Sequence, residues 1–149
     1  MLSDPIRVAL RMAEIFESLG IPYLVGGAVA SVIFGEPRAT EDIDVLADIA
    51  PGQTDALIAT CEAEFYVPLE TLRDAVHRRT SFNIVHLDTV RKVDVFVVRD
   101  AAFDREEMNR RRSTIVARDP EQSIYVGGSD SCQARLVSAR RRHLGSPVA

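Results

Sequence analysis

The sequence contains few cysteines, a single lysine and no long apolar segment. Its two cysteines, Cys61 and Cys132, lie far apart and fit no metal-ligand spacing, so we interpret both as free thiols. No apolar run approaches the roughly 18 to 20 residues that a membrane-spanning helix needs. The first residues lack the basic-then-apolar pattern of a signal peptide. We therefore expect a cytoplasmic protein without a membrane partner.

The charge balance argues against a protein that coats nucleic acid non-specifically. The formal net charge is −4, and Lys92 is the only lysine in the chain. The apolar fraction of 46% and the charged fraction of 27% are ordinary for a globular protein. A length of 149 residues is close to that of one domain, so we expect a single core.

Apolar periodicity predicts an α/β (α+β) domain over residues 1–126, with a mixed β-sheet flanked by helices. We expect helices at 5–19, 28–34, 51–65, 69–78 and 103–112, and strands at 22–25, 42–47, 81–87, 92–98, 114–117 and 123–126. A turn separates the third strand from the fourth, which indicates that these two pair as a hairpin.

The feature that indicates chemistry is the strand that begins at Asp42. Side chains alternate along a strand, so Asp42 and Asp44 project from one face while Ile43 and Val45 enter the core. Two neighbouring carboxylates repel each other, and a cation relieves that cost. Mg²⁺ suits such a pair, because it binds through one or two carboxylates together with substrate phosphates.

A second strand carries one acid, Asp94, within the apolar run Val93–Val98. Aspartate is depleted in strands, so its presence there is unusual. If this strand lies beside the first, the carboxylates of Asp42, Asp44 and Asp94 converge at one edge of the sheet. Three such acids suit a phosphoryl or nucleotidyl transfer with two metals about 3.5 to 4 Å apart.

A double glycine, Gly26-Gly27, stands where a strand is expected to turn into a helix. Glycines at such a turn let backbone N–H groups approach a phosphate, and a helix N-terminus favours negative charge. Arg38 and Thr40 could add a guanidinium and a hydroxyl for the same phosphates. A Gly-Gly pair alone is weak support, because many turns use it for steric reasons.

The order Gly-Gly, a short helix, Arg-x-Thr-x-Asp-Ile-Asp and then Lys-Val-Asp-Val-Phe resembles the polymerase-β-type nucleotidyltransferase superfamily. The resemblance covers about residues 5–126 and is closest to small bacterial nucleotidyltransferases and toxins of the abortive-infection type. It implies the nucleotidyltransferase fold, with the glycine turn at the triphosphate. It also implies metal ligands for Mg²⁺ (or Mn²⁺) at Asp42 and Asp44, and a third acid, at or near the general base, at Asp94.

The reaction implied by the resemblance is in-line attack of an acceptor hydroxyl on the α-phosphate of a nucleoside triphosphate (NTP), with release of pyrophosphate. The acceptor is unknown and could be a tRNA end, a protein hydroxyl or a small molecule. Because the core leaves no residues for a separate acceptor domain, acceptor recognition would come from a partner protein, from an oligomer such as a homodimer, or from a lost C-terminus. The alternative function is a non-catalytic nucleotide- or partner-binding module, such as one component of a toxin–antitoxin pair. A metal-dependent phosphohydrolase is less favoured, because no His-Asp metal cluster is present.

Each candidate residue also has a plainer interpretation. The strand acids could simply face solvent, Arg38 could be a surface arginine, and Lys92 could be solvated rather than bound to nucleotide. His86 on the hairpin is tempting as a base, but a lone histidine there is more often structural. The run Arg110-Arg111-Arg112 is most simply the solvated end of a helix.

Residues 127–149 form an irregular tail that lacks a convincing helix. Read one base later with suitable codons, this segment can encode a sequence similar to the helix with which relatives continue. Our hypothesis is that the tail is frameshifted. Sequencing the coding DNA across codons 126–132 tests it, and an uninterrupted frame without a near-identical longer relative would contradict it.

Overall fold

The computed structural model describes residues 3–26 and 42–127, and these build a mixed seven-stranded sheet in the order β3-β4-β5-β2-β1-β7-β6. The strands are β1 (Tyr23–Val25), β2 (Asp42–Ala47), β3 (Phe65–Tyr66), β4 (Ser81–His86), β5 (Lys92–Val97), β6 (Arg112–Ala117) and β7 (Gln122–Val126). Strand β2 runs parallel to β5 and β1 runs parallel to β7, whereas the other neighbours are antiparallel. The expected mixed sheet and the β4–β5 hairpin are both confirmed.

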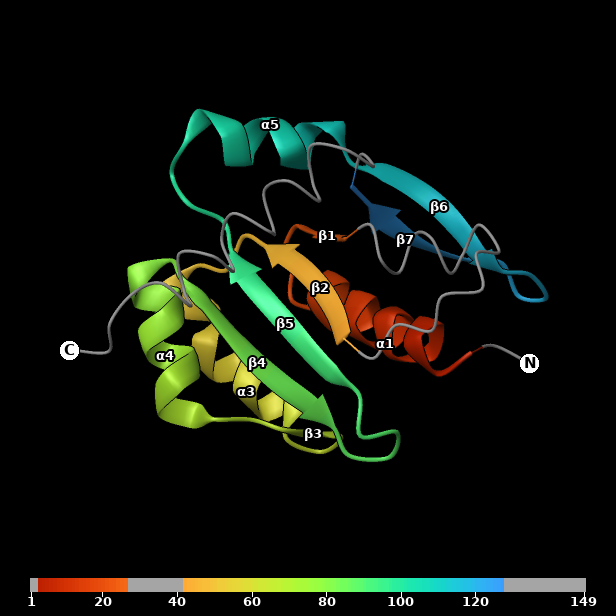
Figure 1. Ribbon diagram of the computed structural model, residues 1–149, viewed down its shortest axis with the longest axis horizontal. Coiled ribbons are helices and arrows are strands. Elements are labelled where there is room, and N and C mark those ends of the chain that lie inside the picture. The colour runs from red at the N-terminus through yellow and green to blue at the C-terminus, as the bar shows by residue number, and fades with distance from the viewer. Residues whose placement is uncertain (1–2, 27–41, 128–149) are drawn as a thin grey trace.

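Three helices cover one face of the sheet: α1 (Asp4–Ser18), α3 (Thr54–Cys61) and α4 (Leu69–Arg78). A short 3₁₀ turn, η1 (Pro51–Gln53), precedes α3. Helix α5 (Ala102–Arg110) lies apart from these three, beyond the end of the sheet at which β2 and β5 finish (Figure 1).

The main core lies between the sheet and its three covering helices. Helix α1 is amphipathic, and its buried side chains include Val8, Met12, Ile15 and Phe16. They belong to one cluster with the buried residues of β1, β2 and β5 that face the helices. Gly20 ends this helix with a φ of 69°, a conformation that glycine adopts without steric cost.

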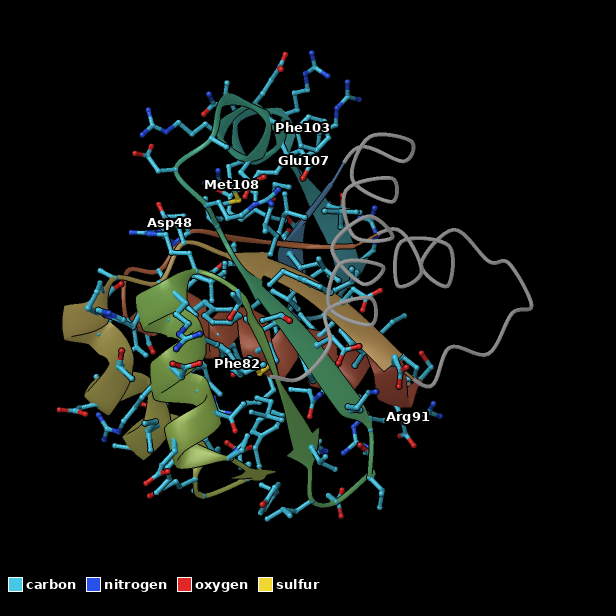
Figure 2. The ribbon with its side chains drawn as sticks, turned by 60° about the vertical axis from the view of Figure 1, so that its left-hand side comes forward. Asp48, Phe82, Arg91, Phe103, Glu107 and Met108 are labelled. Atoms are coloured by element: carbon cyan, nitrogen blue, oxygen red, sulfur yellow. The ribbon has the colours of Figure 1, made fainter. Side chains whose placement is uncertain are left out.

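A second, smaller apolar cluster lies on the other face of the sheet, where Met108 of α5 joins Leu24, Leu46, Phe96 and Val98. Figure 2 shows Met108 extending from α5 toward the strands. The second cluster therefore covers the finishing ends of β2 and β5, and it leaves their starting ends to a different environment.

The buried carboxylate of Asp104 holds the connection from β5 to α5. It accepts the backbone N–H of Arg99 at 2.7 Å and the guanidinium of the same arginine at 3.4 Å. Charge-assisted bonds of this kind are stronger than neutral ones, so the chain is fixed where it enters α5.

Two expected helix ends are wrong. The helix expected over 51–65 ends at Cys61, because Phe65 pairs with His86 as part of β3. The helix expected over 103–112 ends at Arg110, and Arg112 already pairs with Val126 in β6. In both places the pairing with a distant strand outweighs the local helical pattern. The expected helix 28–34 and the tail after residue 127 lie outside the described residues.

The core position of Cys61 predicts a chemically silent thiol. Its side chain is buried, and burial raises the pKa of the thiol to about 12. The thiolate is the reactive form, so in a Cys132→Ser variant the native protein should not react with a thiol reagent at pH 8. Reaction should appear only on unfolding in denaturant. Rapid reaction of the native variant would show that α3 does not pack as described.

The packing of β2 predicts a large loss of stability when Ile43, which is fully buried, is truncated. Ile43→Ala should lower the free energy of unfolding by about 2–5 kcal/mol, measured by urea denaturation. The matched control is Ile115→Ala in β6, where the side chain is 40% exposed and the loss should stay below about 1 kcal/mol. Equal losses would contradict the central position of β2.

Candidate metal and nucleotide site

The two acid-bearing strands lie side by side at the centre of the sheet. In the parallel β2–β5 ladder, Asp42 is aligned with Lys92 and Asp44 with Asp94. Aligned residues of neighbouring strands share a face, so these four side chains lie on the same side of the sheet. The expectation that the strands are neighbours is confirmed. The acids lie at the starting ends of two central strands, however, and not at an edge of the sheet.

The alternate residues of both strands anchor this arrangement. Ile43 and Val45 of β2, and Val93 and Val95 of β5, are 0% exposed and belong to the core beneath the helices. A shift of one residue in either strand would exchange these apolar side chains for the polar ones. Burial therefore fixes the face on which the acids lie.

Lys92 brings a positive charge between two of the acids. Its Nζ lies 3.8 Å from Oδ2 of Asp42 and 3.9 Å from Oδ1 of Asp94. These are ion-pair distances, longer than a hydrogen bond. The side chain of Lys92 is 43% exposed, so it reaches the acids from the solvent side. The prediction that this residue contacts nucleotide stays a prediction.

Asp94 is much more shielded than Asp42, with side-chain exposures of 16% and 42%. The difference follows from position, because β5 has a long strand on each side and places Asp94 between Asp44 and Asn83. Within the described ranges, no three Asp, Glu, His or Cys side chains are grouped closely enough to hold a metal by themselves. The register thus aligns Asp44 with Asp94 in one row across the strands and leaves Asp42 two residues away along β2 on the same face. A metal would need further adjustment of these side chains.

Gly26 continues the sheet beyond β1 and lies beside Asp44. Its backbone N–H donates to the carbonyl of Asp44 at 2.7 Å, so this amide belongs to the sheet. The sequence predicts instead that the amide approaches a phosphate. Gly26 itself adds no side chain next to Asp44.

Sequence reasoning missed Asn83. This exposed residue of β4 is aligned with Asp94 on the face of the acids. It extends the row across four strands, in the order Gly26, Asp44, Asp94 and Asn83. The signal in the sequence is an asparagine within a strand, a place where this residue type is depleted.

The other candidate site residues either lie away from this row or lie outside the described residues. His86 is buried, and its Nδ1 accepts the backbone N–H of Thr89 at 3.3 Å. Its ring packs against Phe65 at a centroid distance of 5.0 Å, which favours the structural interpretation. Gly27, Arg38 and Thr40 lie outside the described residues, and their predicted phosphate contacts stay predictions.

The three arginines at the end of α5 do not form one solvated group. Arg110 pairs with Glu106 within the helix. Arg111 instead donates from Nη1 to the carbonyl of Met108 at 2.7 Å, and its guanidinium lies 4.6 Å from the ring centroid of Tyr125. The interpretation as a solvated helix end therefore holds for Arg110 and fails for Arg111, whose guanidinium connects the end of α5 to Tyr125 of β7.

In the ranges that the structure describes, no helix is long and apolar enough to cross a bilayer. No family model and no curated protein matches the sequence.

Solved structures give the comparison that sequence does not. An antigenic nucleotidyltransferase-like protein from Paracoccidioides brasiliensis aligns with a TM-score of 0.56 and 18% identity, over 96% of this chain and 69% of that one. A proposed nucleotidyltransferase from Thermotoga maritima aligns with a TM-score of 0.54 and 13% identity, over 96% and 91%. The lincosamide antibiotic adenylyltransferase LnuA, bound to lincomycin, aligns with a TM-score of 0.53 and 15% identity, over 92% and 85%.

These neighbours cover nearly the whole chain, and all of them are nucleotidyltransferases or resemble them. Identities this low establish architecture and leave chemistry to the residues of the site. The mixed sheet, its helical layer and these alignments together show that the chain has the fold of the polymerase-β-type nucleotidyltransferases.

Proposed function

We propose that this chain transfers a nucleoside monophosphate from an NTP to an acceptor hydroxyl, with Mg²⁺ (or Mn²⁺) held by Asp42, Asp44 and Asp94. The observation that carries the proposal is the register of β2 and β5, which aligns Asp44 with Asp94 and keeps Asp42 on the same face. Without a bound cation, the mutual repulsion of these carboxylates would only destabilise the sheet.

The donor set suits a hard divalent cation. All three candidate ligands are carboxylates, and Mg²⁺ and Mn²⁺ favour oxygen ligands. A positive charge is already drawn to the same place, because the ammonium of Lys92 lies within 4 Å of two of the carboxylates. A bound metal would supply charge stabilisation for the triphosphate during transfer.

The order of residues along the row separates two sides of the proposed site. Gly26 lies on the β1 side of Asp44, and we assign the phosphates to this side because a glycine lets them approach the backbone. Asp94 lies on the β4 side and is more shielded than Asp42. We assign Asp94 to the acceptor side, where it would receive the proton of the attacking hydroxyl directly or through water.

A small-molecule hydroxyl is the first acceptor class to examine, ahead of a tRNA end or a protein side chain. The support is the structural neighbour that is an adenylyltransferase of lincosamide antibiotics, which aligns over most of both chains. ATP is for the same reason the first nucleotide to examine.

The carboxylate row predicts metal-dependent nucleotide binding that requires Asp42 and Asp44. Calorimetric titration of each Mg·NTP should show binding to the wild-type protein. The double variant Asp42→Asn/Asp44→Asn should weaken it by more than about a hundredfold, since each charge-assisted contact contributes about 1.5–3 kcal/mol. Titration without Mg²⁺ should give little binding.

The matched control is Asp74→Asn on α4, where the carboxylate pairs with Arg78 at the surface and its loss should leave binding unchanged. Far-ultraviolet circular dichroism should show that all three proteins are folded. If a folded wild-type protein binds no Mg·NTP, the enzymatic proposal is wrong. The same titration with equal affinity in the double variant would place the nucleotide elsewhere.

A further inference from the structure

Lys92 has an unusual place in this molecule. It is the only lysine of the chain, and its ammonium lies between the carboxylates of Asp42 and Asp94. Its neighbours in β5 hold the backbone firmly, because Val93 and Val95 are fully buried. The side chain itself is 43% exposed, so it can leave the acids without disturbing the core.

The charges explain why a cation belongs there. Asp42, Asp44 and Asp94, which we call the acid row, place three carboxylates on adjacent positions of two strands. Like charges at this spacing repel, and one ammonium within 4 Å of two of them offsets part of that repulsion. A divalent metal bound to the same oxygens would meet the ammonium at close range and be repelled by it.

We propose that Lys92 is a resident counter-ion of the acid row and that a divalent metal must displace it in order to bind. This inference rests on the metal site of the proposed function. Lys92 is then a positioning residue that holds the carboxylates of Asp42 and Asp94 near each other before metal binds. It also makes the site weak for metal alone.

The displaced ammonium has a natural second partner in the triphosphate that accompanies the metal. A lysine side chain is a compact charge on a flexible four-carbon stem, which suits a move from carboxylates to phosphates. Metal and nucleotide then favour each other, because the nucleotide stabilises Lys92 in its displaced position. By linkage this coupling acts equally in both directions.

The first test is titration with Mn²⁺ in the absence of nucleotide, in which the electron paramagnetic resonance signal measures the concentration of free Mn²⁺. Lys92→Met should bind Mn²⁺ at least about fivefold more tightly than the wild type, the low end of usual coupling between sites. Lys92→Arg keeps the charge and should remain weak. Arg73→Met, which removes an exposed cation paired with Asp55 on the far side of the sheet, should match the wild type.

The same variants should respond in the opposite sense to nucleotide. With saturating Mn²⁺, Lys92→Met should bind NTP at least about fivefold more weakly than the wild type, because a phosphate contact is lost. A lysine that only stabilised the fold would not raise the affinity for metal while lowering that for nucleotide.

A direct readout uses the fact that Lys92 is the only lysine. Reductive methylation with ¹³C-formaldehyde labels its amine and the α-amino group while keeping the positive charge. Addition of Mg²⁺ should shift the Lys92 signal in a saturable manner and leave the α-amino signal in place. In Asp42→Asn/Asp44→Asn no such shift should occur.

The outcomes separate this inference from the proposed function. Equal Mn²⁺ affinity in the wild type and Lys92→Met would overturn the counter-ion role while leaving the metal site intact. Failure of both folded proteins to bind Mn²⁺ would instead overturn the metal site. Tighter binding by Lys92→Met, together with a shifted Lys92 signal in the wild type, would support displacement.

Discussion

The parallel ladder between β2 and β5 is the constraint on which the rest of this structure depends. It joins two strands whose aligned residues lie 50 positions apart in the sequence, and it aligns their polar positions while burying their apolar ones. The three covering helices pack on the buried positions, and the acids are left on the opposite face. Helix α5 closes only the far end of that face, through Met108. The core and the candidate site therefore lie on opposite faces of the same pair of strands.

Much of this arrangement is readable from the sequence, because alternation along a strand is a local property. The bounds of β2 and the hairpin of β4 and β5 follow from such patterns. Features that depend on distant partners do not. Phe65 continues a helical pattern, yet it pairs with β4, and the amide of Gly26 is taken by the carbonyl of Asp44. Asn83 is unusual as an asparagine within a strand, but only the pairing of β4 with β5 places it beside Asp94.

The fold and the proposed activity are supported by different observations. Structural neighbours with identities of 13% to 18% establish the architecture, and this architecture can host members that differ in acceptor or chemistry. The residues instead support the proposed nucleotidyl transfer. Asp44 and Asp94 lie in one row across the strands, between Gly26 and Asn83, and Asp42 lies on the same face of β2. The position of Lys92 adds that the row attracts a cation even in the absence of metal.

The matching patterns of β2 and β5 also bear on how such a chain can evolve. In both strands the first and third residues are partly exposed, and the second and the last three are buried. Inserting or deleting one residue inside either strand would turn its carboxylates toward the helices and its apolar side chains toward solvent. Changes of length are therefore confined to the turns between strands, such as the segment that links β4 to β5. The two strands can diverge by substitution, but the register between them must be kept.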